Sequence, residues 1–126
     1  MRKILSVSHF PIAFAAILIL LSAVACGSSK AKALREQLKP GMSASEVAEL
    51  LRSNKDGHYY VKVSGQDEIR PFTEFEKVLD AISKQQDARV VVNVLFMGPG
   101  FLHNEFDVVL DSEGKVESLT PLKQWD

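Results

Sequence analysis

The sequence has only one cysteine, Cys26, among its 126 residues. A lone cysteine excludes an intramolecular disulfide and any metal site that is built from several thiolates. A folded domain made from this chain therefore takes its stability from its packed core, because no covalent cross-link is available.

The net charge of the chain is also small, at −1 overall. Of the 15 Lys and Arg, two are Arg2 and Lys3, which leaves 13 basic against 16 acidic side chains in the rest of the chain. Domains that bind nucleic acids show a basic patch or stripe. The balance therefore predicts no nucleic-acid partner.

Recognisable catalytic motifs are also missing. There is no Gly-x-Ser-x-Gly sequence, no phosphate-binding loop and no second histidine at zinc-finger spacing. We therefore expect a protein that is not an enzyme, with no cofactor, no metal and no identified small-molecule substrate. One alternative stays open. His103, Glu105 and Asp107 are spaced by two, so they are expected on one face of a strand, where they could bind a metal or act in acid–base chemistry. The same spacing is also typical of a strand face that is simply exposed to solvent.

What the sequence does have is an apolar run after a basic start. Ile4 to Ala25 follows Arg2 and Lys3 and ends in small residues, which is the layout of a secretory signal. The ending Ala23-Val24-Ala25-Cys26 resembles the lipobox of bacterial lipoproteins, in which the cysteine is acylated and becomes the new N-terminus. This resemblance implies a lipoprotein signal peptide at 1–25, a lipidated tether at 26–30 and a single domain at 31–126.

Lipidation of Cys26 would anchor the domain to a membrane, because two or more acyl chains hold a protein there stably. Gly27 follows the cysteine, and by resemblance to Gram-negative lipoproteins the absence of aspartate implies sorting to the outer membrane, with the domain facing the periplasm. The alternative is an uncleaved N-terminal helix in the inner membrane, since Ile4 to Ala25 just reaches the roughly 20 apolar residues of a span.

Helical periodicity begins directly after the predicted tether. Apolar residues recur at helical spacing over 30–39, and Pro40-Gly41 ends that pattern. Ser43 and Glu46 form a capping-box sequence at the start of a second helix over 44–52.

A third helix is predicted over 75–85, where Thr73 and Glu76 repeat the capping-box sequence. The C-terminal third alternates as strands do. The predicted strands are 58–64, 90–96, 103–110 and 116–119, with a hairpin turn at 111–114. The expected fold is α+β: two N-terminal helices packed on an antiparallel sheet of about four strands, with one additional helix.

Residues 38–51 and 106–116 resemble the opening and the terminal hairpin of the SmpA/OmlA (BamE-like) family of small outer-membrane lipoproteins. The first segment has the glycine, the methionine and the capping hydroxyl (Gly41, Met42 and Ser43) that precede a helix in that family. The resemblance implies a role in outer-membrane assembly or integrity. The expected function is a non-catalytic, membrane-anchored module that binds another envelope protein; the alternative is an envelope hydrolase with a polar site on the sheet.

The predicted contact with a protein partner is Phe101 and Leu102, which follow Gly98-Pro99-Gly100. Two large apolar side chains in a loop are typical of a binding site, although the same two residues can also fold back into the core. Tyr60 and Trp125 are expected to be partly buried packing residues.

Overall fold

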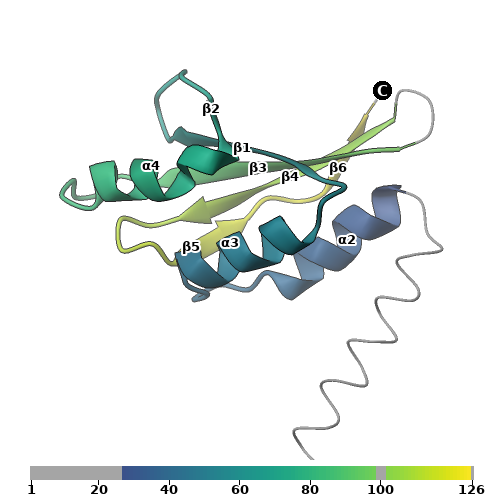
Figure 1. The fold of residues 1–126 in the computed structure, drawn as a ribbon, viewed down its shortest axis with the longest axis horizontal. Coiled ribbons are helices and arrows are strands. Elements are labelled where there is room, and N and C mark those ends of the chain that lie inside the picture. The colour runs from purple at the N-terminus through teal and green to yellow at the C-terminus, as the bar shows by residue number, and fades with distance from the viewer. Residues whose placement is uncertain (1–26, 99–101, 126) are drawn as a thin grey trace, which may run out of the picture.

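The computed structural model describes residues 27–98 and 102–125 (Figure 1). Cys26 and Phe101 lie outside these ranges. The elements are α2 (Gly27–Gln37), α3 (Ala44–Ser53), β1 (His58–Val63), β2 (Arg70–Pro71), η1 (Phe72–Glu74), α4 (Phe75–Ile82), β3 (Val90–Met97), β4 (His103–Leu110), β5 (Val116–Leu119) and β6 (Lys123–Trp125). The predicted α+β class is confirmed.

All strand pairs in the sheet are antiparallel, and the strand order is β2-β1-β3-β4-β5. The last strand, β6, also pairs with β4, along its first residues from His103 to Glu105. The sheet is therefore larger than the predicted four strands. The two additional strands, β2 and β6, have two and three residues, which is too short for an alternating pattern to be recognised. The longest ladder joins β3 to β4, from Val90 opposite Leu110 to Met97 opposite His103.

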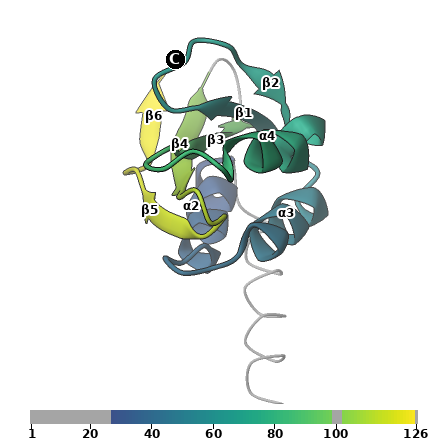
Figure 2. The same ribbon diagram turned by 90° about the vertical axis from the view of Figure 1, so that its left-hand side faces the viewer.

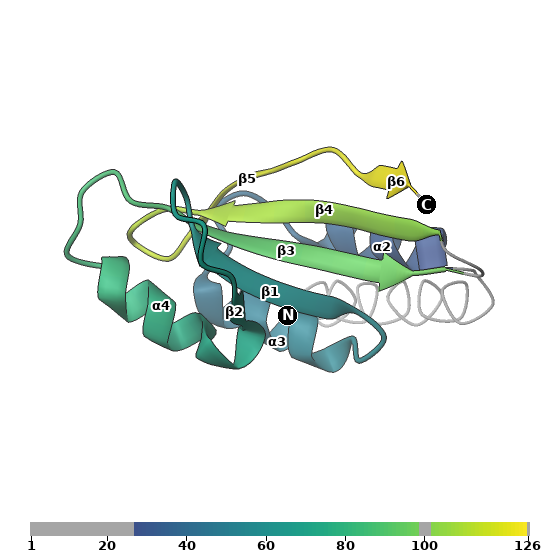
Figure 3. The ribbon, with the colours of Figure 1, turned by 90° about the horizontal axis from the view of Figure 1, so that it is seen from above.

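Alternation along the strands divides the sheet into two faces, as predicted. The core face is made of fully buried side chains from β1, β3 and β4: Val61, Val90, Val92, Val94, Phe96, Phe106, Val108 and Leu110. Buried side chains of α2, α3 and α4 join the same core, and the helices lie on that side of the sheet (Figures 1 and 2). No helix of the described residues covers the opposite side, which we call the open face (Figure 3).

The predicted capping box at the start of α3 is confirmed. Ser43 is extended, with φ −77° and ψ 159°, and its Oγ accepts a hydrogen bond from the Glu46 amide at 3.2 Å. Glu46 Oε1 in turn accepts from the Ser43 amide at 3.0 Å. The bond from the Ser43 amide above all, and a second one that the Ser43 hydroxyl donates to the same oxygen at 3.0 Å, hold the pKa of Glu46 below its usual value.

Ser43→Ala is expected to lower the free energy of unfolding by about 1 kcal/mol, because the helix loses its side-chain cap. The difference from the wild type should shrink only in part below about pH 4, because Ser43→Ala removes the hydroxyl that donates to the Glu46 carboxylate but keeps the amide that does most to lower its pKa. A group with a lowered pKa stabilises the fold above its unfolded pKa and loses that contribution as it is protonated. Urea denaturation at neutral and at acidic pH measures both effects. An equal loss for Ser45→Ala, an exposed serine at the second position of the helix, would contradict the capping role.

The second predicted capping box, at Thr73 and Glu76, is wrong. Thr73 lies inside the 3₁₀ turn η1, and α4 begins at Phe75 without a side-chain cap. The extended residue before the turn is Pro71, at ψ 155°, so the chain enters this helix through the 3₁₀ turn and Thr73 does not have the extended backbone that an N-cap needs. The helix also ends at Ile82, before the predicted Gln85.

The first helix, α2, begins at Gly27, within the segment predicted as a tether. Its far end connects to the β4–β5 turn, where the Gly41 amide donates to Val116 O at 2.8 Å and the Val116 amide donates to Met42 O at 2.9 Å. No helix among residues 27–98 and 102–125 has the length and the apolar character required to cross a membrane.

Candidate functional site

A cluster of hydrogen-bonded polar side chains lies at the centre of the open face. Asn93 of β3 donates through Nδ2 to Glu105 Oε2 at 3.0 Å and to Asp107 Oδ1 at 2.9 Å on β4. Trp125 of β6 donates through Nε1 to the other oxygen of Glu105 at 3.0 Å. The register places these side chains together, because Asn93 stands directly opposite Asp107 and Trp125 lies two residues beyond Lys123, the partner of Glu105.

Neither carboxylate of this cluster has an ion-pair partner among the described residues. The ion pairs found there join Lys30 to Asp56, Arg52 to Glu76, Arg70 to Glu68 and to Glu74, and Arg89 to Glu117. Glu105 and Asp107 are held instead by neutral donors, which satisfy only part of their capacity to accept hydrogen bonds. Both are therefore available to a cationic group that approaches the open face.

A groove of about 320 Å³ runs beside this cluster. It is lined by Tyr60, Val61, Lys62, Ile69, Val91, Asn93, Glu105 and Asp107. One wall is apolar and unusually open, since Tyr60 is 42% exposed and Ile69 is 66% exposed. The other wall contains the two carboxylates. The groove thus offers an apolar contact and acidic acceptors side by side.

The β1–β2 connection carries Ile69 and rises on the side of the sheet away from α2 and α3 (Figure 1). Arg70 fixes the end of this connection, because its guanidinium donates to Glu68 at 2.9 Å and to Glu74 at 2.8 Å. Pro71 also pairs with Tyr60 across the strands, which brings the connection beside the groove. The wall is therefore held by local ion pairs and by one short strand.

At one end of the open face lie Met97, His103 and Trp125, which are neighbours across β3, β4 and β6. The rings of His103 and Trp125 meet edge to face, with centroids 4.3 Å apart. Met97 is 54% and Trp125 45% exposed. Leu102, which directly precedes His103, is 37% exposed.

The alternation that placed His103, Glu105 and Asp107 on one strand face is confirmed, but the three side chains do not converge. His103 contacts Trp125, whereas Glu105 and Asp107 share Asn93. The described residues contain no group of three or more His, Cys, Asp or Glu placed to hold a metal ion. The geometry therefore joins the two carboxylates to an amide rather than to a histidine.

Several residues of the open face could not be recognised from the sequence. Ile69 lies in a polar loop without periodicity, and Asn93 reaches Glu105 and Asp107 only because β3 and β4 are in register. Tyr60 and Trp125 were expected to be packing residues, yet both are more than two-fifths exposed. The one sequence signal available was Asn93 itself, a polar residue in an otherwise apolar strand.

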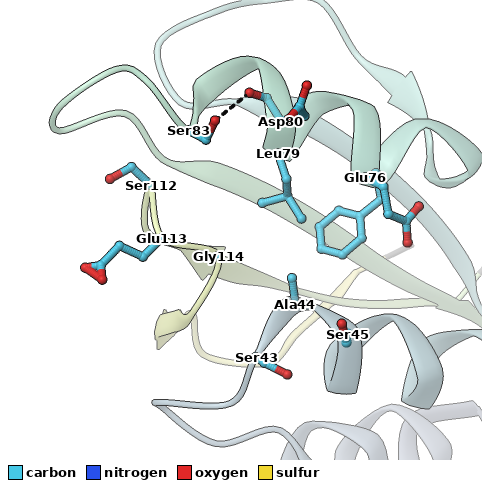
Figure 4. Close-up of a pocket in the computed structure, with 11 residues that line it drawn as sticks. Ser43, Ala44, Ser45, Glu76, Leu79, Asp80, Ser83, Ser112, Glu113 and Gly114 are labelled. Carbon is cyan, nitrogen blue, oxygen red and sulfur yellow. Dashed lines mark hydrogen bonds between the residues drawn. The ribbon is translucent and has the colours of Figure 1, made fainter.

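A second hollow, of about 450 Å³, lies between the start of α3, α4 and the β4–β5 turn (Figure 4). Three of its polar side chains are engaged locally: Ser43 caps α3, Ser83 Oγ donates to Asp80 O at 2.8 Å, and Glu76 pairs with Arg52. The side chains of Ser45, Asp80, Ser112 and Glu113 come from three separate elements and are not hydrogen-bonded to one another, so they form no network like the one on the open face. The open face is therefore the better candidate site.

No family model, no curated protein and no solved structure matched this chain when it was compared with each. The resemblance of residues 38–51 and 106–116 to the SmpA/OmlA family accordingly stays a prediction from the sequence.

Proposed function

We propose that this protein is a non-catalytic lipoprotein of the cell envelope that binds another envelope protein. Acylated Cys26 anchors it to the outer membrane, and the domain faces the periplasm. The support for the anchor is the basic start, the apolar run and the lipobox-like sequence before Cys26. A role in outer-membrane assembly or integrity follows from the family resemblance, which also implies two N-terminal helices packed on an antiparallel sheet. The additional helix over 75–82 is an insertion relative to that architecture.

The observation that carries the binding function is the groove on the open face. Exposed apolar side chains that adjoin acidic acceptors favour a protein segment with a basic side chain between apolar ones. Tyr60 and Ile69 would contact the apolar part of such a segment. Glu105 and Asp107 would accept hydrogen bonds from its lysine or arginine, and bonds to charged groups are the stronger kind.

Of the contact predicted at Phe101 and Leu102, only Leu102 is among the described residues. Leu102 lies at the end of the sheet, beside His103 in the chain and on the side of Asn104, whereas the groove lies at the middle of the open face. Variants of the groove and variants of the end therefore test two separate contacts.

Acylation of Cys26 is tested by metabolic labelling with a clickable fatty acid. We expect label on the wild-type protein and none on Cys26→Ala, because the cysteine thiol is the site of attachment. Membrane fractionation of the same two proteins should show the wild type in the outer membrane and the variant lost from it. Label that persists on Cys26→Ala would contradict the anchor.

Binding at the groove is tested by placing a photo-crosslinking amino acid at Tyr60 in intact cells and identifying the adduct by mass spectrometry. The protein found in this way is then purified for affinity measurements. Tyr60→Thr with Ile69→Ser is expected to weaken binding by about tenfold or more, because exposed apolar anchors carry much of the energy of an interface. The matched control is Met97→Ser with Leu102→Ser, which removes exposed apolar surface outside the groove. Equal losses for both pairs, or none for the groove pair, would reject the groove.

A further inference from the structure

Three exposed apolar side chains gather at one end of the domain. Met97 stands opposite His103 in the ladder, and His103 stands opposite Trp125. Leu102 is the residue before His103. We call Met97, Leu102 and Trp125 the end row; their exposed fractions are 54%, 37% and 45%. Met97 and Trp125 lie on the open face, whereas Leu102 lies on the other side of the sheet, where a Cβ on Gly98 would be 3.6 Å from the Leu102 Cβ and 3.8 Å from Nδ2 of the buried Asn104. Large apolar side chains exposed on both sides of one end of the sheet favour an apolar or interfacial partner at that end.

The helix that follows the anchor starts at this same end. The segment that follows α2 is bonded through Gly41 and Met42 to Val116, which lies opposite Leu110 at the other end of the sheet. Near its start, Lys30 Nζ bonds Asp56 Oδ2 at 2.7 Å, in the turn that leads into β1. His58, at the start of β1, pairs with Leu95, close to Met97. Figures 1 and 3 agree, since both show the start of α2 at the end of the sheet where β6 lies.

The distance from the anchor to the domain is short. The helix begins at Gly27, so one peptide unit, about 3.8 Å between Cα atoms, separates it from Cys26. The polar headgroup zone of one leaflet is about 5–8 Å thick. The end row therefore lies near headgroup depth when Cys26 carries its acyl chains.

We propose that the end row inserts into the headgroup region of the bilayer that holds Cys26. This inference rests on the proposed lipid anchor. Tryptophan is enriched at membrane interfaces because its ring is apolar and its N–H is polar, and Met97 and Leu102 add apolar area that can reach the acyl boundary. Lys55, beside Asp56, and Lys123, two residues before Trp125, are exposed and can meet anionic headgroups.

This contact gives the domain a fixed orientation. The strands stand upright on the membrane, and the groove lies about 13 Å from the end row, because four residues of strand separate Asn93 from Met97. The open face then points sideways, where a neighbouring envelope protein can reach it. Leu102 is thereby assigned to the lipid rather than to the protein partner that the sequence alone suggested.

Trp125 is the only tryptophan of the chain, so its fluorescence reports the contact directly. The full lipidated protein is reconstituted into vesicles of phosphatidylethanolamine and phosphatidylglycerol, with and without a phospholipid that carries a nitroxide on its headgroup. The matched control moves the tryptophan to the groove, by Trp125→Phe with Tyr60→Trp. We expect the nitroxide lipid to quench Trp125 at least about twofold more strongly than the tryptophan at position 60, because interfacial tryptophans lie at headgroup level.

Flotation of the same vesicles separates the two proposals. Protein that floats but shows equal quenching at positions 125 and 60 overturns the end-row contact and leaves the anchor intact. Protein that does not float overturns both. If Met97→Ser with Leu102→Ser abolishes binding of the crosslinked partner while Trp125 stays unquenched, a protein occupies the end row and the bilayer contact is rejected.

Discussion

Phe106→Ala is expected to lower the free energy of unfolding by about 3–5 kcal/mol, which is the cost of removing a buried phenylalanine and leaving a cavity. Phe106 is 2% exposed and lies on β4 directly opposite Val94 of β3, at the middle of the sheet. The side chains around it are held in two strands of the longest ladder, so they cannot easily close the cavity. Urea denaturation followed by circular dichroism measures the loss.

The control for this prediction is Val109→Ala on the same strand. Val109 lies on the open face and is only half-buried, so its truncation leaves no closed cavity and is expected to cost about 1 kcal/mol or less. A similar loss for Val109→Ala and Phe106→Ala would mean that the two faces of the sheet are assigned the wrong way round.

Phe75→Ala is expected to have an effect of the same size, about 3–5 kcal/mol, by loosening α4 from the core. Phe75 is fully buried and stacks on Phe72 at 4.9 Å between ring centroids, with Tyr59 edge-on to Phe72 at 5.8 Å. Burial raises the pKa of Tyr59 to about 12, with a smaller contribution from Asp56, so its hydroxyl stays protonated and donates to Asn54 O at 2.6 Å. The aromatic group thus ties α4 and η1 to β1.

Leu79→Ala tests whether the loss is specific to the aromatic contact. Both Phe75 and Leu79 line the hollow shown in Figure 4, but Leu79 is only partly buried whereas Phe75 is fully buried, so truncation of Leu79 removes less apolar area from the core. We expect its truncation to cost less than half as much as Phe75→Ala. Equal losses would show that α4 is held by general apolar burial along its length and not by the stacked pair.

Three features of the fold were predicted correctly from sequence patterns alone. Alternation assigned the buried side of β3 and β4 correctly, because the side-chain period of a strand is fixed by backbone geometry. The hairpin at Asp111 to Gly114 was equally readable, since Gly114 takes the positive φ of 79° that the turn requires. The Ser43 cap was readable because both of its hydrogen bonds lie within four residues.

The same local pattern failed at Thr73 and Glu76, which shows its limit. There Phe72 stacks on Phe75, and the chain comes directly from β2, so a 3₁₀ turn replaces the extended cap. The four residues of a capping-box pattern contain no information about the stacking of Phe72 on Phe75 or about the direct connection to β2.

The sequence by itself determined which residues face the core, where α3 starts and which residue types line the polar strand face, because each depends on contacts between near neighbours in the chain. Tertiary structure alone decided that Asn93 holds Glu105 and Asp107, that Ile69 stands beside Tyr60, and that Trp125 returns to the start of β4, near the start of α2. The physical reason is register: these contacts join residues far apart in sequence, and only the pairing of complete strands brings them within hydrogen-bond or van der Waals distance.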